Sequence, residues 1–573
     1  MPDLHFSRFI PAWKWLKSYS PKHFQADSLA AFIVIAMLVP QGMAYAMLAG
    51  LPPIMGLYAS VLPMLVYALL GGSTTLSIGP VALISMMTFA TLNPLFEVGS
   101  PVYIESAMLL GLMVGIISLL LGIFRFGFLI QLVSHPVIQS FIIASALLIA
   151  LGQVKFLLNV PLNANNIPDL LQSTIHYIAY AHVPSMILGV AAILFLIYAP
   201  RLIQKTKIKH AKFLGLLTKA MPLILIVLSI TLVTLLDLKS IGIKTVGYIP
   251  SGFPALHLPH WNLELVKMLL PGAIMIAMVS FIESLSIAQV TALQQRNHLN
   301  SNQELLALGV ANISAGLSSA FPVAGSLSRT VVNADAGAKT PMAGVISSLL
   351  IVGVSLFFTG FFKDLPLGIL AATIMVSIWK LVDIQPFISA WHYSKADGLA
   401  MWITFFGVLF LDITTGLLIG ITSTFILMLW RISRPHIAII GLVEGTQHFR
   451  NIQRHHVQTA PHILSLRIDE NLNFMNSQHL KGFLINQISQ NTELEHVILN
   501  CSSISAIDLS ALEMLEDLNH ELTKLAIQLH FSEIKGPVMD KLSQSSLMKH
   551  LNGRIYLTHY QAINDLQSEP SSI

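Results

Sequence analysis

The chain has 573 residues, of which 54% are hydrophobic and only 10% are charged, and its mean hydropathy is +0.72. Soluble globular domains are about a quarter charged, so this composition indicates an integral membrane protein and argues against a soluble enzyme. The formal net charge of +4 is too small and too dispersed to indicate a nucleic-acid partner. The single cysteine, Cys501, excludes an intrachain disulfide framework.

Residues 1–27 form a polar N-terminal segment that contains charges and aromatic side chains. The segment has no apolar core followed by a small-residue cleavage site, so it does not read as a signal peptide. We expect it to lie in the cytoplasm, with Trp13 and Trp15 at the membrane interface.

Apolar runs of spanning length recur through residues 28–434, which we interpret as a transmembrane domain of about fourteen spans. Basic residues precede the first span and fill the stretch 201–212, whereas the loop 156–182 has no lysine or arginine. The positive-inside rule therefore places the N-terminus and 201–212 in the cytoplasm and 156–182 outside. Arg431 and Arg434 follow the last span and place the C-terminus inside as well.

Two apolar segments are interrupted, STTLSIGPVALIS (73–85) and FPVAGSLSRTVVN (321–333). Helices that begin in mid-membrane point their positive N-termini at anions. In the first segment, Pro80 suits the first turn of a helix. The backbone N–H groups of Val81 and Ala82 would then be exposed to an anion.

The second interrupted segment offers Ser326 and Ser328 as alternative N-caps. Arg329 would add a full positive charge beside the helix end. The alternative interpretation is that both breaks are loops between full spans and that Arg329 reaches a membrane interface. Because two such breaks occur together with an intramembrane carboxyl group, we favour a binding site.

That carboxyl group belongs to Glu283, which lies in the apolar run 271–290. An acidic side chain at membrane depth is costly and is rarely placed there without a partner or a task. Glu283 can bind and release a proton near neutral pH, and so couple proton entry to substrate entry. The structural alternative is a permanent ion pair with Arg329 or a cap on a helix break.

Gln41 and Tyr45 lie one helical turn apart in the first span and can share a face. They are candidate neutral contacts to the substrate, or simply a polar pair between packed helices. The first span, which carries Gln41, resembles in its placement the eighth span, which carries Glu283. The two interrupted segments correspond to each other in the same way. Matching interrupted segments in two halves predict an internal repeat with the binding site at its centre.

Other site chemistry is not indicated. The chain has no P-loop, so an ATP-driven pump is not implied. The histidine pair His455–His456 lacks metal-ligand spacing, and no nucleophile–base arrangement stands out. We therefore expect neither an enzyme nor a cofactor.

Residues 441–566 have a different composition, with shorter apolar runs and more charge. Strands alternating with amphipathic helices predict a small cytoplasmic α/β domain. The expected strands are 462–468, 496–501 and 527–534, and the expected helices are 476–490 and 509–523.

The stretch PQGMAYAMLAGLPPIMGLYAS (40–60) closely resembles the signature of the sulfate permease (SulP) anion transporters. The resemblance continues through LSIGPVALIS, ESLSIAQ and SLSRTVVNADAGAKTPMAG. The segment LNCSSISAIDLSALEML (499–515) resembles a STAS domain. The resemblance therefore covers nearly the whole chain.

The resemblance implies a helical membrane protein of fourteen segments in a seven-plus-seven inverted repeat, divided into a core and a gate domain. It implies an anion site between two half-helices, the third and tenth segments, with the first and eighth segments beside it. Glu283 falls where proton-coupled members carry a glutamate. It also implies a homodimer and alternating access. The site residues carried over by position are Gln41, Tyr45, Ile78, Gly79, Val81, Ala82, Ser328 and Arg329.

Two positions depart from the family pattern. Ser73 is followed by Thr74 instead of a basic residue, which affects no site residue. Asp508 is followed by Leu509, and a serine comes only at Ser510. In related STAS proteins that act as phosphorylation switches, a serine directly follows this aspartate. We therefore expect the STAS segment of this chain to have a structural role or to bind a cytoplasmic protein.

The leading hypothesis is proton-coupled symport of a small anion across the cell inner (plasma) membrane. Sulfate, bicarbonate and C4-dicarboxylates are the candidate substrates. One alternative is an uncoupled exchanger or channel on the same fold, against which Glu283 argues. Another is a membrane scaffold whose STAS domain recruits soluble partners, against which the two half-helices and Arg329 argue.

Overall fold

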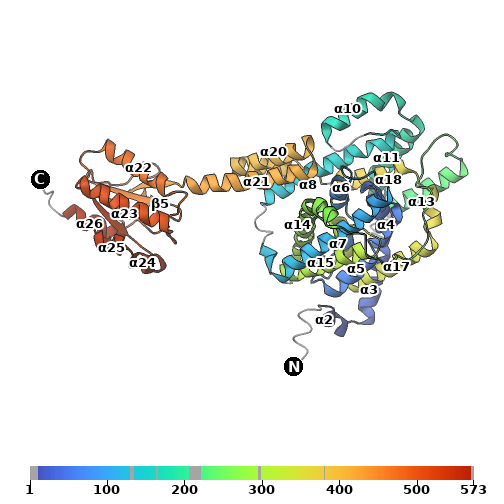
Figure 1. Ribbon diagram of the computed structural model, residues 1–573, viewed down its shortest axis with the longest axis horizontal. Coiled ribbons are helices and arrows are strands. Elements are labelled where there is room, and N and C mark those ends of the chain that lie inside the picture. Colours follow the sequence, from blue (N-terminus) through green and yellow to red (C-terminus); the bar gives the residue numbers. More distant parts are fainter. Residues whose placement is uncertain are drawn as a thin grey trace. The chain divides into compact units, whose positions relative to one another are not determined.

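The computed structural model describes residues 11–128, 134–162, 166–205, 218, 221–294, 299–379 and 381–568. Residues 206–212 of the basic stretch and residues 1–10, on which the expected orientation partly depends, lie outside the described residues. Internal contacts divide the chain into two units, one ending at Thr424 and one beginning at Phe425 (Figure 1).

The first unit is almost entirely helical in its described part. Its helices in the first half of the chain are α2 (Ala12–Lys17), α3 (Pro21–Leu48), α4 (Pro53–Tyr58), α5 (Leu62–Leu70), α6 (Ala82–Leu92), α7 (Pro101–Ile123), α8 (His135–Gly152), α9 (Val154–Leu158), α10 (Ile167–Tyr177), η2 (Ile178–Tyr180), α11 (Val183–Lys205) and α13 (Met221–Leu235). Those that follow are α14 (Leu263–Gln294), α15 (Ser301–Leu317), α16 (Leu327–Asp335), α17 (Met342–Phe357), η3 (Thr359–Asp364), α18 (Leu367–Trp379), α19 (Gln385–Tyr393), α20 (Lys395–Phe410) and α21 (Ile413–Ser433). Two short strands, β1 (Ile78–Gly79) and β2 (Ala324–Gly325), precede α6 and α16.

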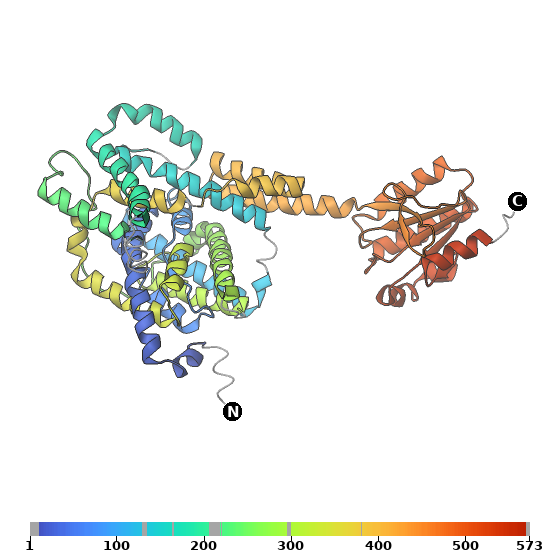
Figure 2. The same cartoon turned by 180° about the vertical axis from the view of Figure 1, so that it is seen from behind.

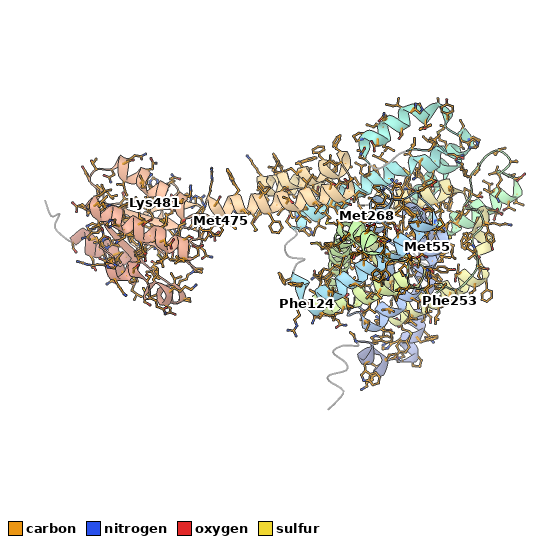
Figure 3. All side chains as sticks on the ribbon, in the orientation of Figure 1. Met55, Phe124, Phe253, Met268, Met475 and Lys481 are labelled. Atoms are coloured by element: carbon orange, nitrogen blue, oxygen red, sulfur yellow. The ribbon has the colours of Figure 1, made fainter. Side chains whose placement is uncertain are left out.

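Many of these helices can cross a membrane. Within the described residues, seven continuous helical stretches are long and apolar enough to span it, and α6, α13, α17 and α18 are shorter apolar helices. Large apolar side chains also face outward: Phe124 on the C-terminal side of α7 and Met268 on α14, both labelled in Figure 3, are 66% and 51% exposed. Such a surface suits contact with lipid. The chain is a multi-pass membrane protein.

The helices repeat in two halves. Helix α3 packs against α16 and α17 in the way that α14 packs against α6 and α7. Likewise, α8 packs against α20 as α11 packs against α18. The successive segments are α3, α4–α5, α6, α7, α8–α9, α11 and α13 in the first half, and α14, α15, α16, α17, α18, α20 and α21 in the second. These mirrored contacts confirm the expected seven-plus-seven repeat.

The same contacts separate a core from a gate. In the core, α15 lies along α7 and α5 (Figure 1), and α3, α6, α14, α16 and α17 pack around them. The gate is built from α8, α9, α11, α18 and α20, which contact one another. Fewer contacts, such as those of α3 with α18 and of α6 with α8, join the two groups.

Within the core, α3 and α4 approach closely at two glycines. A Cβ atom added to Gly56 would lie 1.9 Å from the backbone oxygen of Gly42. Adding a Cβ to Gly42 would bring it to 3.0 Å from the backbone oxygen of Gly56. The neighbouring atoms are backbone and cannot rotate away, so the contact requires glycine.

Replacing Gly56 with alanine is therefore expected to force α4 away from α3 and to destabilise the protein by about 1–3 kcal/mol or more. Thermal unfolding of the purified protein in detergent would measure the loss. Gly353 on α17 is a matched control, because an added Cβ there meets nothing within 4 Å. Equal unfolding temperatures for the Gly56→Ala and Gly353→Ala variants would contradict the packing argument.

The second unit is an α/β domain. Its strands are β3 (Ile437–Leu442), β4 (Phe449–Asn451), β5 (Ile463–Ile468), β6 (His496–Asn500), β7 (Gln528–Ser532) and β8 (Ile555–Tyr556). Its helices are α22 (Ser477–Gln490), α23 (Leu509–Lys524), α24 (Gly536–Leu542), α25 (Ser546–His550) and α26 (His559–Ser568). The sheet order is β4-β3-β5-β6-β7-β8, parallel from β5 onward, and Figure 2 shows helices flanking it.

The three expected strands and two expected helices of this unit are present, with ends shifted by at most two residues. Strands β5, β6 and β7 alternate with helices along the chain. Each strand supplies buried apolar residues, such as Leu466 on β5, Leu499 on β6 and Leu529 on β7. The Asp508 side chain caps α23 by accepting a hydrogen bond from the Ala511 N–H at 2.9 Å. Lys481 on α22, labelled in Figure 3, donates to Glu521 on α23 at 2.9 Å.

Buried histidines form part of this unit. His530 on β7 is fully buried, and its Nε2 lies 3.2 Å from Nδ1 of His496. Nδ1 of His530 accepts the Arg554 N–H at 2.9 Å, so this ring nitrogen carries no proton. Burial, with charge from His496 and Arg554, lowers the pKa of His530 to about 4. Burial likewise lowers the pKa of His559 to about 4.

We expect acid to destabilise the second unit through these two side chains. The unfolded pKa of histidine is about 6.5, so stability is fully present above that pH and is lost as pH falls toward 4. At pH 5 the loss should be roughly 2 kcal/mol per histidine. Hydrogen exchange of β6 and β7 in the full-length protein, compared at pH 7.5 and 5, would measure it after correction for intrinsic rates. His520→Gln, at an exposed position, should leave this pH dependence intact, and a pH-independent stability would contradict the assignment.

Candidate anion-binding site

The two interrupted segments meet in space. Strand β1 pairs antiparallel with β2, with Ile78 opposite Gly325 and Gly79 opposite Ala324. Further hydrogen bonds tie the segments together: the Ser326 N–H donates to the Ser77 carbonyl at 3.0 Å, and the Ser77 N–H donates to the Thr330 hydroxyl at 3.0 Å. Each strand leads directly into a half-helix, α6 or α16, so the two helix N-termini are held close together.

The first half-helix starts later than the sequence predicts. Helix α6 begins at Ala82, and Val81 is an extended N-cap without a side-chain hydrogen bond. Ile78 and Gly79 lie in β1 and not in the half-helix, and Pro80 does not occupy the first helical turn. The expectation for Pro80 is therefore wrong, because pairing with β2 keeps this stretch extended.

The second half-helix begins at Leu327, with Ser326 as its N-cap. Of the two serines considered from the sequence, Ser326 therefore takes this position. Ser328 lies inside α16 and is exposed, and its hydroxyl is 3.3 Å from that of Ser326.

Arg329, in the first turn of α16, is fully buried. Its Nη1 donates to the Pro80 carbonyl at 2.9 Å, while Nε and Nη2 have no hydrogen-bond partner among the described residues. Gly79 allows this approach, since an added Cβ there would lie 3.3 Å from Nη2. Arg329 therefore does not reach a membrane interface. A buried cation with two unsatisfied donors is costly unless an anion binds to it.

Glu283 and Tyr45 lie near this guanidinium. Both groups interact electrostatically with Arg329, from α14 and α3. Glu283 is partly buried, and in the part of the chain that the structure describes its Oε2 has no hydrogen-bond partner. No ion pair within 4.0 Å joins it to Arg329. The permanent ion pair considered from the sequence is therefore not formed here.

Gln41 and Tyr45 are both buried on α3, and no described residue forms a hydrogen bond with Oε1 of Gln41. Helix α3 packs against both α6 and α16, while α14 packs against α6 and β2. The four elements that carry the expected site residues are thus neighbours. Together they offer two helix N-termini, a guanidinium with free donors, a carboxyl group and a neutral amide.

Two side chains that the sequence does not single out hold this site together. The Gly325 N–H donates to the Ser284 hydroxyl at 2.8 Å, which fixes β2 against α14 beside Glu283. The Asn333 amide donates to the Thr75 carbonyl at 2.9 Å. Ser284 directly follows Glu283 in the sequence, and this adjacency was the sequence feature that could have pointed to Ser284.

Known proteins resemble this chain over most of its length. The model of the Sulfate permease family matches residues 24–404, and that of the STAS domain matches residues 455–562. Sulfate transporter 4.1, chloroplastic, of Arabidopsis thaliana is 36% identical over 553 residues, which cover 94% of this chain and 80% of the relative. High affinity sulfate transporter 1 of Stylosanthes hamata is 31% identical, with 98% and 86% covered.

Two solved structures share the fold. The murine Solute Carrier 26 family member A9 anion transporter, in the inward-facing state, has a TM-score of 0.90 at 21% identity and covers 99% of this chain and 95% of its own. The transmembrane domain of the cyanobacterial bicarbonate transporter BicA has a TM-score of 0.60 at 20% identity, with 71% and 98% covered. From the family match and the relatives above 30% identity, the chain belongs to the sulfate permease family and carries a C-terminal STAS domain.

Proposed function

We propose that this protein is a secondary active transporter that moves small anions together with protons by alternating access. The observation that carries this proposal is the fully buried Arg329, whose Nε and Nη2 lack partners beside the N-termini of α6 and α16. An anion there would satisfy both donors and would face the positive ends of two helices. No covalent chemistry is needed for such a role.

The proposed substrates are sulfate, bicarbonate and C4-dicarboxylates. Guanidinium donors and helix N-termini recognise negative charge and oxygen acceptors, which all three share. The names of the relatives add weight to sulfate, since the similar Arabidopsis and Stylosanthes proteins are sulfate transporters. The BicA fold neighbour adds weight to bicarbonate.

We assign proton coupling to Glu283. A protonated carboxyl group would bring a proton into the site and would remove negative charge beside the anion. Its position near Arg329 makes the two events interdependent, because the anion and the carboxylate compete for the same positive charge. Movement of the core against the gate would then expose the loaded site to the other side.

The same proposal covers location and assembly. We place the protein in the cell inner (plasma) membrane, with both termini in the cytoplasm, on the loop charges. We expect a homodimer, as the family resemblance implies. The STAS unit has a folded sheet and helices of its own and is a candidate surface for a cytoplasmic protein partner.

Uptake into proteoliposomes tests the function. Labelled sulfate, bicarbonate and fumarate would be offered with and without an inward proton gradient, and with sodium varied separately. Accumulation of one anion that follows the proton gradient would support symport and name the substrate. Equal downhill flux with no response to the gradient would favour an uncoupled exchanger or channel and would contradict the role of Glu283.

A further inference from the structure

A cavity with both polar and apolar lining residues lies in the gate, away from Arg329. It has a volume of about 570 Å³ and is formed where α9, α11 and α18 meet the segment between α13 and α14, which contributes Ile243 and Lys244. Its lining includes Lys155 on α9, Ser185 on α11, Lys244, and Gly368 at the start of α18. None of the expected site residues lines it.

The cavity is positively charged. Lys155 and Lys244 both line it, and no aspartate or glutamate does. Among the described residues, no carboxylate oxygen lies within 4.0 Å of either ammonium group. Lys239, on the same side of the gate, instead forms an ion pair with Asp364. The first turns of α11 and α18 add their positive helix ends to the lining.

Apart from Asn159, the remaining walls are apolar. They are formed by Phe156, Val160, Leu162, Leu188 and Ile243. The volume falls within the range of about 300–1,000 Å³ that is typical of organic ligands. A small inorganic ion would leave most of this space unfilled, so the shape calls for an anionic group attached to an apolar body.

Lys155 is well placed to hold the anionic group. It is partly buried, and its Nζ lies 4.9 Å from the centre of the Phe156 ring and 5.9 Å from that of Phe89. These aromatic faces are weak partners for a cation compared with an anion at hydrogen-bond distance. Burial also makes an unpaired charge costly, which favours the arrival of a counter-charge.

We propose that this cavity binds an amphipathic anion, with its carboxylate, sulfate or phosphate group at Lys155 and Lys244 and its apolar part against Phe156 and Leu188. An anionic lipid and a soluble organic anion both have this chemistry. By the loop charges, the cavity lies toward the outer face, beside the loop 156–182. The site is independent of the transport proposal, because it rests on residues outside the half-helix site.

The test uses the full-length protein in phosphatidylcholine nanodiscs and octyl phosphate as the probe. Calorimetric titration would compare octyl phosphate with octanol, which has the apolar body but no charge. We expect octyl phosphate to bind at least ten-fold more tightly than octanol. The Lys155→Gln/Lys244→Gln double variant should lose about ten-fold or more of the octyl phosphate affinity.

Two further variants make the result decisive. Lys239→Gln removes a lysine that is already ion-paired and does not line the cavity, so it should leave binding unchanged. Gly368→Leu adds bulk inside the cavity, where a Cβ meets no atom closer than 3.6 Å, and should block binding without removing a charge. Unchanged octyl phosphate affinity in both the double lysine variant and Gly368→Leu would overturn the site.

Native mass spectrometry separates the two sources of the anion. Nanodiscs containing phosphatidylglycerol would be compared with phosphatidylcholine alone. A lipid site would be identified if phosphatidylglycerol stays bound to the wild type, is lost from the double lysine variant and competes with octyl phosphate. Octyl phosphate binding without such retention would identify a soluble organic anion. If the double lysine variant still binds both phosphatidylglycerol and octyl phosphate, the assignment is contradicted.

Discussion

Replacing Arg329 with alanine is expected to weaken anion binding by about ten- to a hundred-fold, because a lost charge-assisted hydrogen bond costs about 1.5–3 kcal/mol. In the wild type the guanidinium has two donors without a partner, so the bound anion gains both. Anion-dependent stabilisation measures the effect. At an anion concentration of 100 Kd, binding should stabilise the wild type by about 2.7 kcal/mol, and about half of this gain or more should vanish in the variant.

The same variant separates binding from folding. A fully buried, incompletely paired cation destabilises the anion-free protein, so Arg329→Ala should unfold at the same or a higher temperature when no anion is present. Arg201→Ala, at an exposed position on α11, is the matched control and should keep the full anion response. An unchanged response in Arg329→Ala would show that the helix N-termini alone hold the anion.

Replacing Glu283 with glutamine is expected to abolish proton-driven accumulation while leaving anion binding and counterflow intact. Glutamine has nearly the same shape as glutamate but cannot take up or release a proton in this pH range. In the structure, Oε2 of Glu283 has no hydrogen-bond partner that the amide would disrupt. Uptake into proteoliposomes with an inward proton gradient, followed by counterflow without one, measures both halves of the prediction.

Glu264→Gln is the control for Glu283, since it removes an exposed carboxylate from the same helix, α14. This variant should accumulate the anion as the wild type does. Full gradient-driven accumulation by Glu283→Gln would exclude the coupling role and leave the carboxyl group a structural part of the site. Loss of counterflow as well would instead indicate that Glu283 is needed for anion binding.

The sequence by itself determined the class of this protein and the position of its breaks. Membrane insertion follows from composition and from the length of apolar runs, which are local properties. The strands and helices of the second unit also follow from local periodicity, and β5, β6 and β7 lie within two residues of their expected positions. The motifs around Gln41, Gly79, Glu283 and Arg329 were sufficient to select the residues of the candidate site.

Only the tertiary structure decided how those residues meet. The start of α6 was misplaced because β1 is held extended by β2, a partner that local sequence does not reveal. The burial of Arg329 and its bond to Pro80, 249 positions away, depend on the folding of one half of the chain against the other. Nothing in the local sequence indicates that Lys155 lines a cavity between α9, α11 and α18, because that cavity forms only where these helices meet. Local patterns report what each segment can form, whereas charge environments and cavities arise from contacts between distant segments.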